Sequence, residues 1–146
     1  MSATSAKETV LAAIESVETR DLDRLAALYD PAIAFDWPPG LPYSGHYESG
    51  HIAAMTERFA SVWEPLQKTE HERRMDPTVV ATAGDTVVVR YVTRGADAAG
   101  RRFETPVLAR YRARDGRLVE AQMYYWDPIG LKEFIKSAGI GEARDE

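Results

Sequence analysis

Apolar residues recur every three or four positions in three segments of the first half of the chain. That spacing places them on one face of an amphipathic helix. Asp21 has a side chain that suits a helix N-cap, so we expect it to begin the second helix, and Ser49 or Gly50 to begin the third. The apolar faces are Val10, Ala13, Ile14 and Val17 within residues 8–17, then Leu22, Leu25, Leu28 and Tyr29, and then Ile52, Met55, Phe59, Val62 and Trp63.

Strands dominate the second half of the chain, where β-branched residues are frequent and turn residues separate them. Asp115-Gly116 is typical of a two-residue hairpin turn, and Gly84-Asp85 separates an earlier pair of strands. A short strand over residues 32–37 should end at Pro38-Pro39-Gly40, because proline lacks the N–H that a central strand uses. Residues 68–75 have a weak strand pattern. The hairpin strands are expected at residues 78–83, 86–93, 102–114 and 117–126.

A short helix ends the predicted fold. Asp127 and Pro128 suit its N-cap and first turn, and Gly139 suits its C-cap. Helices followed by hairpins predict the α+β class, with the helices on one face of a curved antiparallel sheet. The length of 146 residues suits a single core, so we expect one domain over residues 1–140 and a disordered tail over residues 141–146.

The last hairpin predicts which side chains share a face of the sheet. If pairing continues regularly from the turn, Tyr111 lies opposite Glu120 and Ala109 lies opposite Gln122. The other face carries three arginines, which are costly to bury, so we expect it to meet solvent or a polar subunit interface. A slip of one residue would invert the assignment. The face toward the helices, which resembles a cavity wall, comprises Val107, Ala109, Tyr111, Leu118, Glu120, Gln122, Tyr124 and Trp126.

Composition and charge exclude several classes of function. The formal net charge of −5, from 23 acidic and 18 basic residues, argues against a nucleic-acid partner and against an anionic membrane surface. The absence of cysteine excludes disulfides, thiolate ligands and cysteine nucleophiles. The first ten residues lack the features of a signal peptide, and no apolar run is long enough to span a bilayer. We therefore expect a soluble cytoplasmic protein.

Asp36 is the first candidate for chemistry, because it lies between Phe35 and Trp37 where an apolar run meets the proline loop. A carboxylate at the mouth of an apolar pocket is suited to moving protons, although an ordinary role at the end of a strand is the alternative. His46 and His51 lie in and after the loop and could relay protons over the pocket mouth. The histidines lack ligand spacing, and no phosphate-binding or nucleophile motif is present, so we expect neither metal nor cofactor.

Three stretches of the chain together resemble the nuclear transport factor 2-like (NTF2-like) superfamily, and within it the branch of ketosteroid isomerases and SnoaL-like polyketide cyclases. They are RDLDRLAALYDPAIAFD, PYSGHYESG and ARDGRLVEAQMYYWDPIGL, and the resemblance extends over nearly the whole chain. It implies a cone-shaped barrel, in which a strongly curved sheet wraps around three N-terminal helices and a short C-terminal helix and encloses an apolar pocket. It also implies a homodimer, which often forms through the sheet.

The resemblance implies roles for single residues as well. Asp36 ends the segment that matches the one carrying the general base of ketosteroid isomerases. The two donors of the isomerase's oxyanion hole fall near Ala13 and at Ala109, and losing one such donor typically costs about 10²–10³ in rate. Asp127 matches the acid or base of SnoaL-like aldol cyclases, but the histidine that those enzymes carry on the preceding strand has no counterpart here.

Two hypotheses follow. The first is a cofactor-independent acid/base enzyme, of the isomerase, aldol cyclase or dehydratase type, acting on an apolar carbonyl-containing small molecule such as a polyketide or steroid-like compound. The second is a non-catalytic small-molecule-binding or assembly module with the same fold. The predicted catalytic residues are Asp36, Asp127 and His46, and the predicted substrate-binding residues are Trp37, Tyr43, Met55, Phe59, Ala109, Tyr111, Glu120, Gln122, Tyr124 and Trp126.

Overall fold

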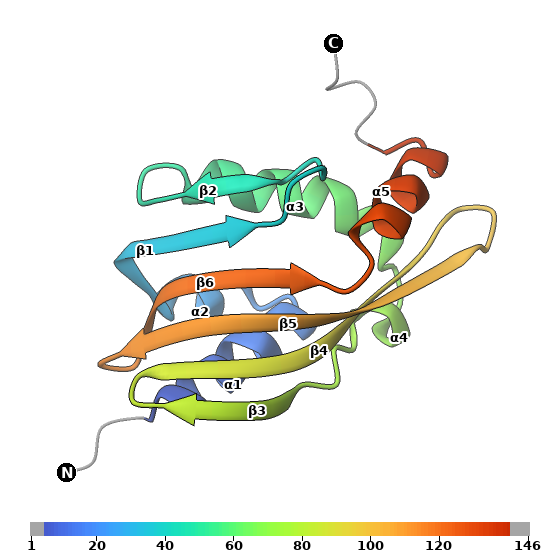
Figure 1. Cartoon of the computed structure of the whole chain (residues 1–146). Helices are drawn as coiled ribbons and strands as arrows, with labels where there is room; N and C mark the ends of the chain where they lie inside the picture. Colours follow the sequence, from blue (N-terminus) through green and yellow to red (C-terminus); the bar gives the residue numbers. More distant parts are fainter. Residues whose placement is uncertain (1–4, 141–146) are drawn as a thin grey trace.

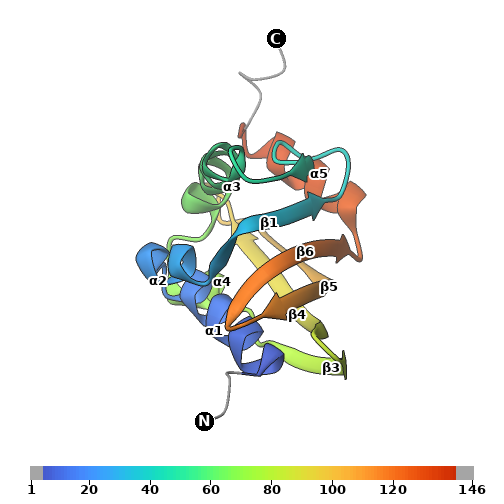
Figure 2. The ribbon, with the colours of Figure 1, turned by 90° about the vertical axis from the view of Figure 1, so that its left-hand side faces the viewer.

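The computed structural model describes residues 5–140, which form a six-stranded sheet with helices on one of its faces (Figure 1). Figure 2 shows the open sheet curving around α1, α2 and α3, so the predicted α+β class is confirmed. The predicted tail at residues 141–146 lies outside the described residues. The helices are α1 (Ala6–Glu18), α2 (Leu22–Ala27), α3 (Ile52–Leu66), α4 (Glu70–Arg73) and α5 (Pro128–Ser137), and the strands are β1 (Tyr29–Trp37), β2 (Gly45–Tyr47), β3 (Thr78–Ala83), β4 (Thr86–Ala96), β5 (Arg102–Arg114) and β6 (Arg117–Tyr125).

A tight turn at Arg20 joins the first two helices. α1 begins with a capping box, in which the side chains of Ser5 and Glu8 each accept the other residue's backbone N–H. Arg20 has a φ of 59°, the left-handed conformation that favours glycine after a helix. Asp21 then caps α2, as predicted. α2 is shorter than predicted, because Tyr29 already belongs to β1.

The sheet is mixed, whereas the sequence predicted an antiparallel one. The strand order is β2-β1-β6-β5-β4-β3, and β1 runs parallel to β6 while the other neighbours are antiparallel. Residues far apart in the chain make this parallel pair, so local turn signals do not reveal it. β2 was not predicted. The strand suggested for residues 68–75 was wrong, because a capping box between Thr69 and Glu72 begins the short helix α4 there.

The pairing of β5 with β6 contains a bulge that was not predicted. Pairing follows the expected register next to the turn, up to Ala113 opposite Leu118, but Arg112 then pairs with Glu120. Val119 is the extra residue on β6. Every later residue of β6 is therefore shifted by one position, and because side chains alternate, the two faces of the strand are exchanged.

The bulge places four predicted inner residues outside. Glu120, Gln122 and Tyr124 lie on the outer face of the sheet, and their predicted position toward the helices was wrong. Trp126 follows the end of the strand and is 82% exposed, against 54% for Tyr124. Apolar residues take the inner face of β6 instead, and they are Leu118, Ala121, Met123 and Tyr125.

The core lies between the inner face of the sheet and the helices. Trp63 of α3 and Tyr43 of the loop before β2 are its largest fully buried side chains. α5 covers one end of the core with the buried residue Leu131, and it begins as predicted with Asp127 as N-cap and proline in its first turn. Within residues 5–140, no helix combines the length and the apolar character that crossing a membrane requires.

Candidate functional site

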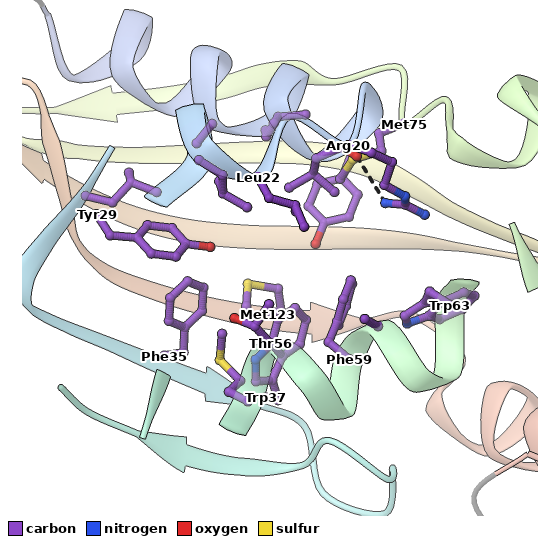
Figure 3. Close-up of a pocket in the computed structure, with 18 of the residues that line it drawn as sticks. Arg20, Leu22, Tyr29, Phe35, Trp37, Thr56, Phe59, Trp63, Met75 and Met123 are labelled. Atoms are coloured by element: carbon purple, nitrogen blue, oxygen red, sulfur yellow. Dashed lines mark hydrogen bonds between the residues drawn. The ribbon is translucent and has the colours of Figure 1, made fainter. Parts of the chain in front are cut away.

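An apolar cavity of about 160 Å³ lies between the helices and the inner face of the sheet (Figure 3). α1 and α2 form one side of the cavity, α3 forms the opposite side, and the sheet forms its back. The wall consists almost entirely of hydrocarbon and aromatic rings. Its residues are Ala13, Ile14, Val17, Arg20, Leu22 and Leu25 from the first helices and their turn, Met55, Thr56, Phe59, Ala60, Trp63 and Glu64 from α3, Tyr29, Phe35, Trp37, Tyr91, Tyr111, Leu118 and Met123 from the sheet, and Met75.

Trp37 is the centre of an aromatic cluster in this wall. Its ring stacks on Phe35 at 6.2 Å between centroids, meets Phe59 at 5.2 Å, and contacts Tyr43 edge-on at 5.1 Å. Among residues 5–140, its indole N–H is the one buried side-chain polar atom without a hydrogen-bond partner. An unpaired buried donor costs about 1–3 kcal/mol. Packing against the surrounding rings therefore holds Trp37 in place despite that cost.

Three tyrosines contribute hydroxyl groups to the otherwise apolar wall. Burial raises the pKa of Tyr29, Tyr91 and Tyr111 well above that of an exposed phenol, so all three stay protonated near neutral pH. Tyr91 and Tyr111 interact through their hydroxyls. The hydroxyl of Tyr29 has no hydrogen bond to any residue that the structure describes, and Figure 3 shows this ring pointing into the cavity. Tyr29 is thus a neutral donor that a ligand oxygen could use.

Two charged side chains complete the wall where the cavity meets the surface. Arg20, in the turn after α1, and Glu64, on α3, both line it, and the neighbouring Leu22 is 58% exposed. Figure 3 shows Arg20 and Tyr29 at opposite ends of the cavity. The interior is therefore neutral, and charge is confined to the mouth.

Asp36 and His46, two predicted catalytic residues, lie together but do not line the cavity. Phe35 and Trp37 face inward, so Asp36 faces outward, and its Oδ1 lies 2.7 Å from Nδ1 of His46. The other ring nitrogen of His46 lies 2.9 Å from Oε2 of Glu48. These hydrogen bonds, first that to Glu48 and then that to Asp36, raise the pKa of His46. The side chains of Asp36 and His46 are about half exposed, and that of Glu48 is mostly exposed.

Asp127, the third predicted catalytic residue, caps α5 and is exposed. Its Oδ1 accepts the backbone N–H of Gly130 at 2.9 Å, and its own N–H donates to Thr105. Gly130 has little room for anything larger, because an added Cβ would lie 2.2 Å from the carboxylate of Asp127. The local structure is thus built around the cap, and Asp127 is not among the residues that line the cavity.

The predicted substrate-binding residues divide into three groups. Those of the first group line the cavity: Trp37, Met55, Phe59 and Tyr111. In the second group, Ala109 and Tyr43 face the core as predicted but do not line the cavity, and the hydroxyl of Tyr43 bonds to that of Tyr125 at 2.7 Å. Those of the third group lie outside the cavity because of the bulge: Glu120, Gln122, Tyr124 and Trp126.

The sequence did not single out Arg20 or Glu64 as candidate residues of the site. One signal for Arg20 exists, because α1 passes into α2 within three residues without the glycine that usually ends a helix at such a turn. A non-glycine residue there suggests a second role for its side chain. Glu64 gives no comparable signal, since an acidic residue on the polar side of a helix is common.

A curved sheet, helices on one face and an apolar cavity between them define an NTF2-like fold. Within that class, the chain belongs to the SnoaL-like domain family, whose sequence profile matches residues 10–121. No curated protein matches the chain by sequence.

Several solved structures share the fold. TerC, co-crystallised with polyporic acid, has a TM-score of 0.74 and 18% identity, over 90% of this chain and 98% of TerC. An NTF2-like protein from Burkholderia thailandensis has a TM-score of 0.70 and 20% identity, over 93% and 98% of the two chains. A candidate polyketide cyclase from Pseudomonas putida has a TM-score of 0.65 and 19% identity, over 84% and 92%. Identities this low indicate a shared fold only.

Proposed function

We propose that the protein binds an apolar, carbonyl-containing small molecule in the cavity, with the carbonyl oxygen accepting a hydrogen bond from Tyr29. The observation that carries the proposal is the unpartnered, protonated hydroxyl of Tyr29 in a wall of hydrocarbon and aromatic rings. Apolar pockets with a few well-placed polar groups are typical of small-molecule sites. The co-crystal of TerC with polyporic acid and the candidate polyketide cyclase, both of this fold, support such an occupant.

The size of the cavity limits what it holds. An engineered cavity of about 150 Å³ in another protein binds benzene. The cavity of this protein measures about 160 Å³, so it accommodates about one aromatic ring without a change of shape. A fused polyketide or steroid-like ligand would have to extend through the mouth past Leu22, or open the gap between α2 and α3. We accordingly propose a ligand with one ring inside and its remaining atoms at the mouth.

The chemistry of the wall favours binding over acid/base catalysis by Asp36. A general base must come within hydrogen-bond reach of the proton that it removes. Asp36 points to the opposite side of β1, and Glu64 is the one carboxylate that lines the cavity among the residues described. The interior offers donors, from tyrosines that stay protonated, rather than bases. Of the two hypotheses from the sequence, the small-molecule-binding module thus has the stronger support.

A matched pair of ligands tests the proposal. Acetophenone carries a carbonyl, and α-methylstyrene replaces that oxygen by a methylene group of similar shape. NMR titration of the wild-type protein should show tighter binding of acetophenone, with shifts at residues of the cavity wall. Tyr29→Phe should abolish the preference without abolishing binding, because it removes only the hydroxyl. Tyr124→Phe, on the outer face, is the matched control and should change nothing.

Three outcomes would contradict parts of the proposal. If neither ligand shifts cavity residues, the cavity is not a binding site for such molecules. If Tyr29→Phe keeps the preference for acetophenone, Tyr29 is not the donor. If Asp36→Asn weakens binding of acetophenone as strongly as Tyr29→Phe does, the carboxylate has access to the ligand, and the acid/base hypothesis regains support.

We also propose a homodimer through the outer face of the sheet. Leu108 and Tyr124 are opposite each other on β5 and β6 and remain 46% and 54% exposed, and the adjacent Trp126 is 82% exposed. Exposed apolar side chains that cluster in this way often mark an interface. Sedimentation velocity should give a dimer for the wild-type protein and a monomer for Trp126→Glu. A monomeric wild-type protein would refute this proposal.

A further inference from the structure

Arg20 is a cation at the cavity wall whose hydrogen bonds go to neutral groups. Its Nη1 donates to the carbonyl oxygen of Val17 at 3.0 Å, and its Nη2 donates to Oε1 of Gln67. No acidic side chain of residues 5–140 forms a salt bridge with it within 4.0 Å. A guanidinium has five N–H donors, and these two hydrogen bonds use two of them. Arg20 therefore has donors left for another acceptor.

The electrostatic surroundings leave the charge of Arg20 incompletely balanced. Burial and the neighbouring Arg73 both lower the pKa of Arg20, while Glu64 acts in the opposite direction, and the guanidinium remains charged. Glu64 is exposed and lies beyond salt-bridge distance. A partly desolvated cation without an ionic partner is unfavourable. An anionic group bound at the mouth of the cavity would remove that disadvantage.

The backbone gives a second, independent reason to look for a role of Arg20. Its φ of 59° lies in the left-handed region, which residues other than glycine rarely adopt. Asp21 N donates to Ser16 O and Arg20 N donates to Val17 O, which is the helix-ending arrangement that glycine usually completes. Strained residues of this kind concentrate at ligand sites. The contact with Val17 also caps α1, so an experiment must separate capping from binding.

Gln67 holds the guanidinium in place from the far side. Its Nε2 donates to the carbonyl oxygen of Arg94 on β4 at 2.9 Å, and this bond fixes which end of the amide faces Arg20. Oε1 is thus directed at the guanidinium. Arg20 is therefore anchored to both α1 and the sheet, and its orientation at the cavity does not depend on a ligand.

We propose that Arg20 binds a carboxylate, so that the ligand of this protein is an apolar carboxylic acid with its ring in the cavity and its acid group at the mouth. The inference rests on the proposed function, because it assumes that the cavity holds a ligand. Guanidinium and carboxylate match in geometry and form strong charge-assisted hydrogen bonds. The separation of Arg20 and Tyr29 at opposite ends of the cavity suits a ligand with an acid at one end and a carbonyl or ring at the other (Figure 3).

The test compares 3-phenylpropanoate with 3-phenylpropanamide, which have the same ring and chain but differ in charge. Dissociation constants are measured by isothermal titration calorimetry at pH 7 and low salt. Wild-type protein should bind the acid at least about tenfold more tightly than the amide, since hydrogen bonds to a charged group are worth about that factor. Arg20→Gly should reduce the ratio to about one. Glycine suits the left-handed backbone, which offsets the loss of the side-chain contacts with Val17 and Gln67, so this variant should keep most of its thermal stability.

Two controls and three outcomes complete the test. Arg24→Gln removes an exposed arginine one turn away, paired with Glu15, and should keep the preference for the acid. Glu64→Gln should keep or increase it, because a nearby negative charge is removed. A wild-type ratio of about one, or a tenfold preference that survives Arg20→Gly, would overturn the role of Arg20. Equal binding of both probes would leave the cavity proposal intact, whereas no binding of either probe would overturn both proposals.

Discussion

Substituting the adjacent residues Tyr124 and Tyr125 separately by alanine should have very different effects on stability. The bulge at Val119 directs Tyr125 into the core, where it is 9% exposed and bonds to the hydroxyl of Tyr43. Tyr124 lies on the outer face and is 54% exposed. In the bulge-free register the two side chains would exchange places. Comparing the two variants therefore tests the register of β6, a strand that forms part of the back of the cavity.

The expected magnitudes follow from burial. Replacing a buried aromatic residue by alanine costs about 3–5 kcal/mol, because a cavity remains in addition to the lost transfer free energy. Tyr125→Ala also leaves Tyr43 without one of its two hydroxyl partners, so we expect a loss of about 4 kcal/mol. Tyr124 is about half exposed, and its removal leaves no internal cavity. We expect Tyr124→Ala to cost about 1 kcal/mol, roughly half of what full burial of such a side chain contributes.

Equilibrium unfolding in urea, followed by circular dichroism, measures both free energies of unfolding. A difference of about 3 kcal/mol between the two variants, with Tyr125→Ala the less stable, would support the bulge. Equal losses, or a larger loss for Tyr124→Ala, would refute the register and with it the outward position of Glu120 and Gln122. Tyr125→Phe is a useful third variant, because it removes the hydroxyl alone and should cost about 1 kcal/mol.

Two further predictions concern the residues that the sequence singled out. The pKa of His46, raised chiefly by Glu48 and then by Asp36, should lie above 6.5 and fall in Glu48→Gln, which NMR titration of the ring would show. Because folding raises this pKa, the contribution of His46 to stability is present below about pH 6.5 and is lost as the pH rises through the folded-state pKa. A pKa at or below 6.5 would contradict the hydrogen bonds of His46 to Glu48 and Asp36. Asp127→Ala should lose about 1 kcal/mol of stability in urea unfolding and Asp127→Asn only a few tenths, since asparagine also caps a helix. A loss of ligand affinity in a fully stable Asp127→Asn protein would instead assign Asp127 to the site.

Local signals in the sequence predicted most of the elements. Helical spacing, the caps at Asp21 and Asp127, and the turn at Asp115-Gly116 depend on residues that are close in the chain, and the structure contains all of them. The parallel pairing of β1 with β6 depends on residues far apart, and no local pattern encodes it. The family resemblance added the strong curvature with which the sheet wraps around the N-terminal helices.

The bulge could have been recognised from an energetic comparison of the two registers. In the regular register, the inner face of β6 would carry Glu120 and Gln122, and burying such groups without partners costs several kcal/mol. With one extra residue, that face carries Ala121, Met123 and Tyr125, all apolar. Glu120 then pairs with Arg110 and Arg112 of β5 on the outside, at 3.2 and 2.9 Å. The predicted mixture of polar and apolar side chains on the inner face suggested a ligand site, but it resulted from the wrong register.

The same reasoning applies to β1, where it decides the chemistry of the cavity. Successive side chains of a strand point to opposite faces, so a carboxylate cannot share a pocket with the residues on both sides of it. Because Phe35 and Trp37 line the cavity, Asp36 must face away, whatever its match to the position of a general base in related enzymes. At the inner face of β1 this protein has aromatic rings. We therefore expect variants of Tyr29 and Arg20, rather than of Asp36, to control what the protein binds.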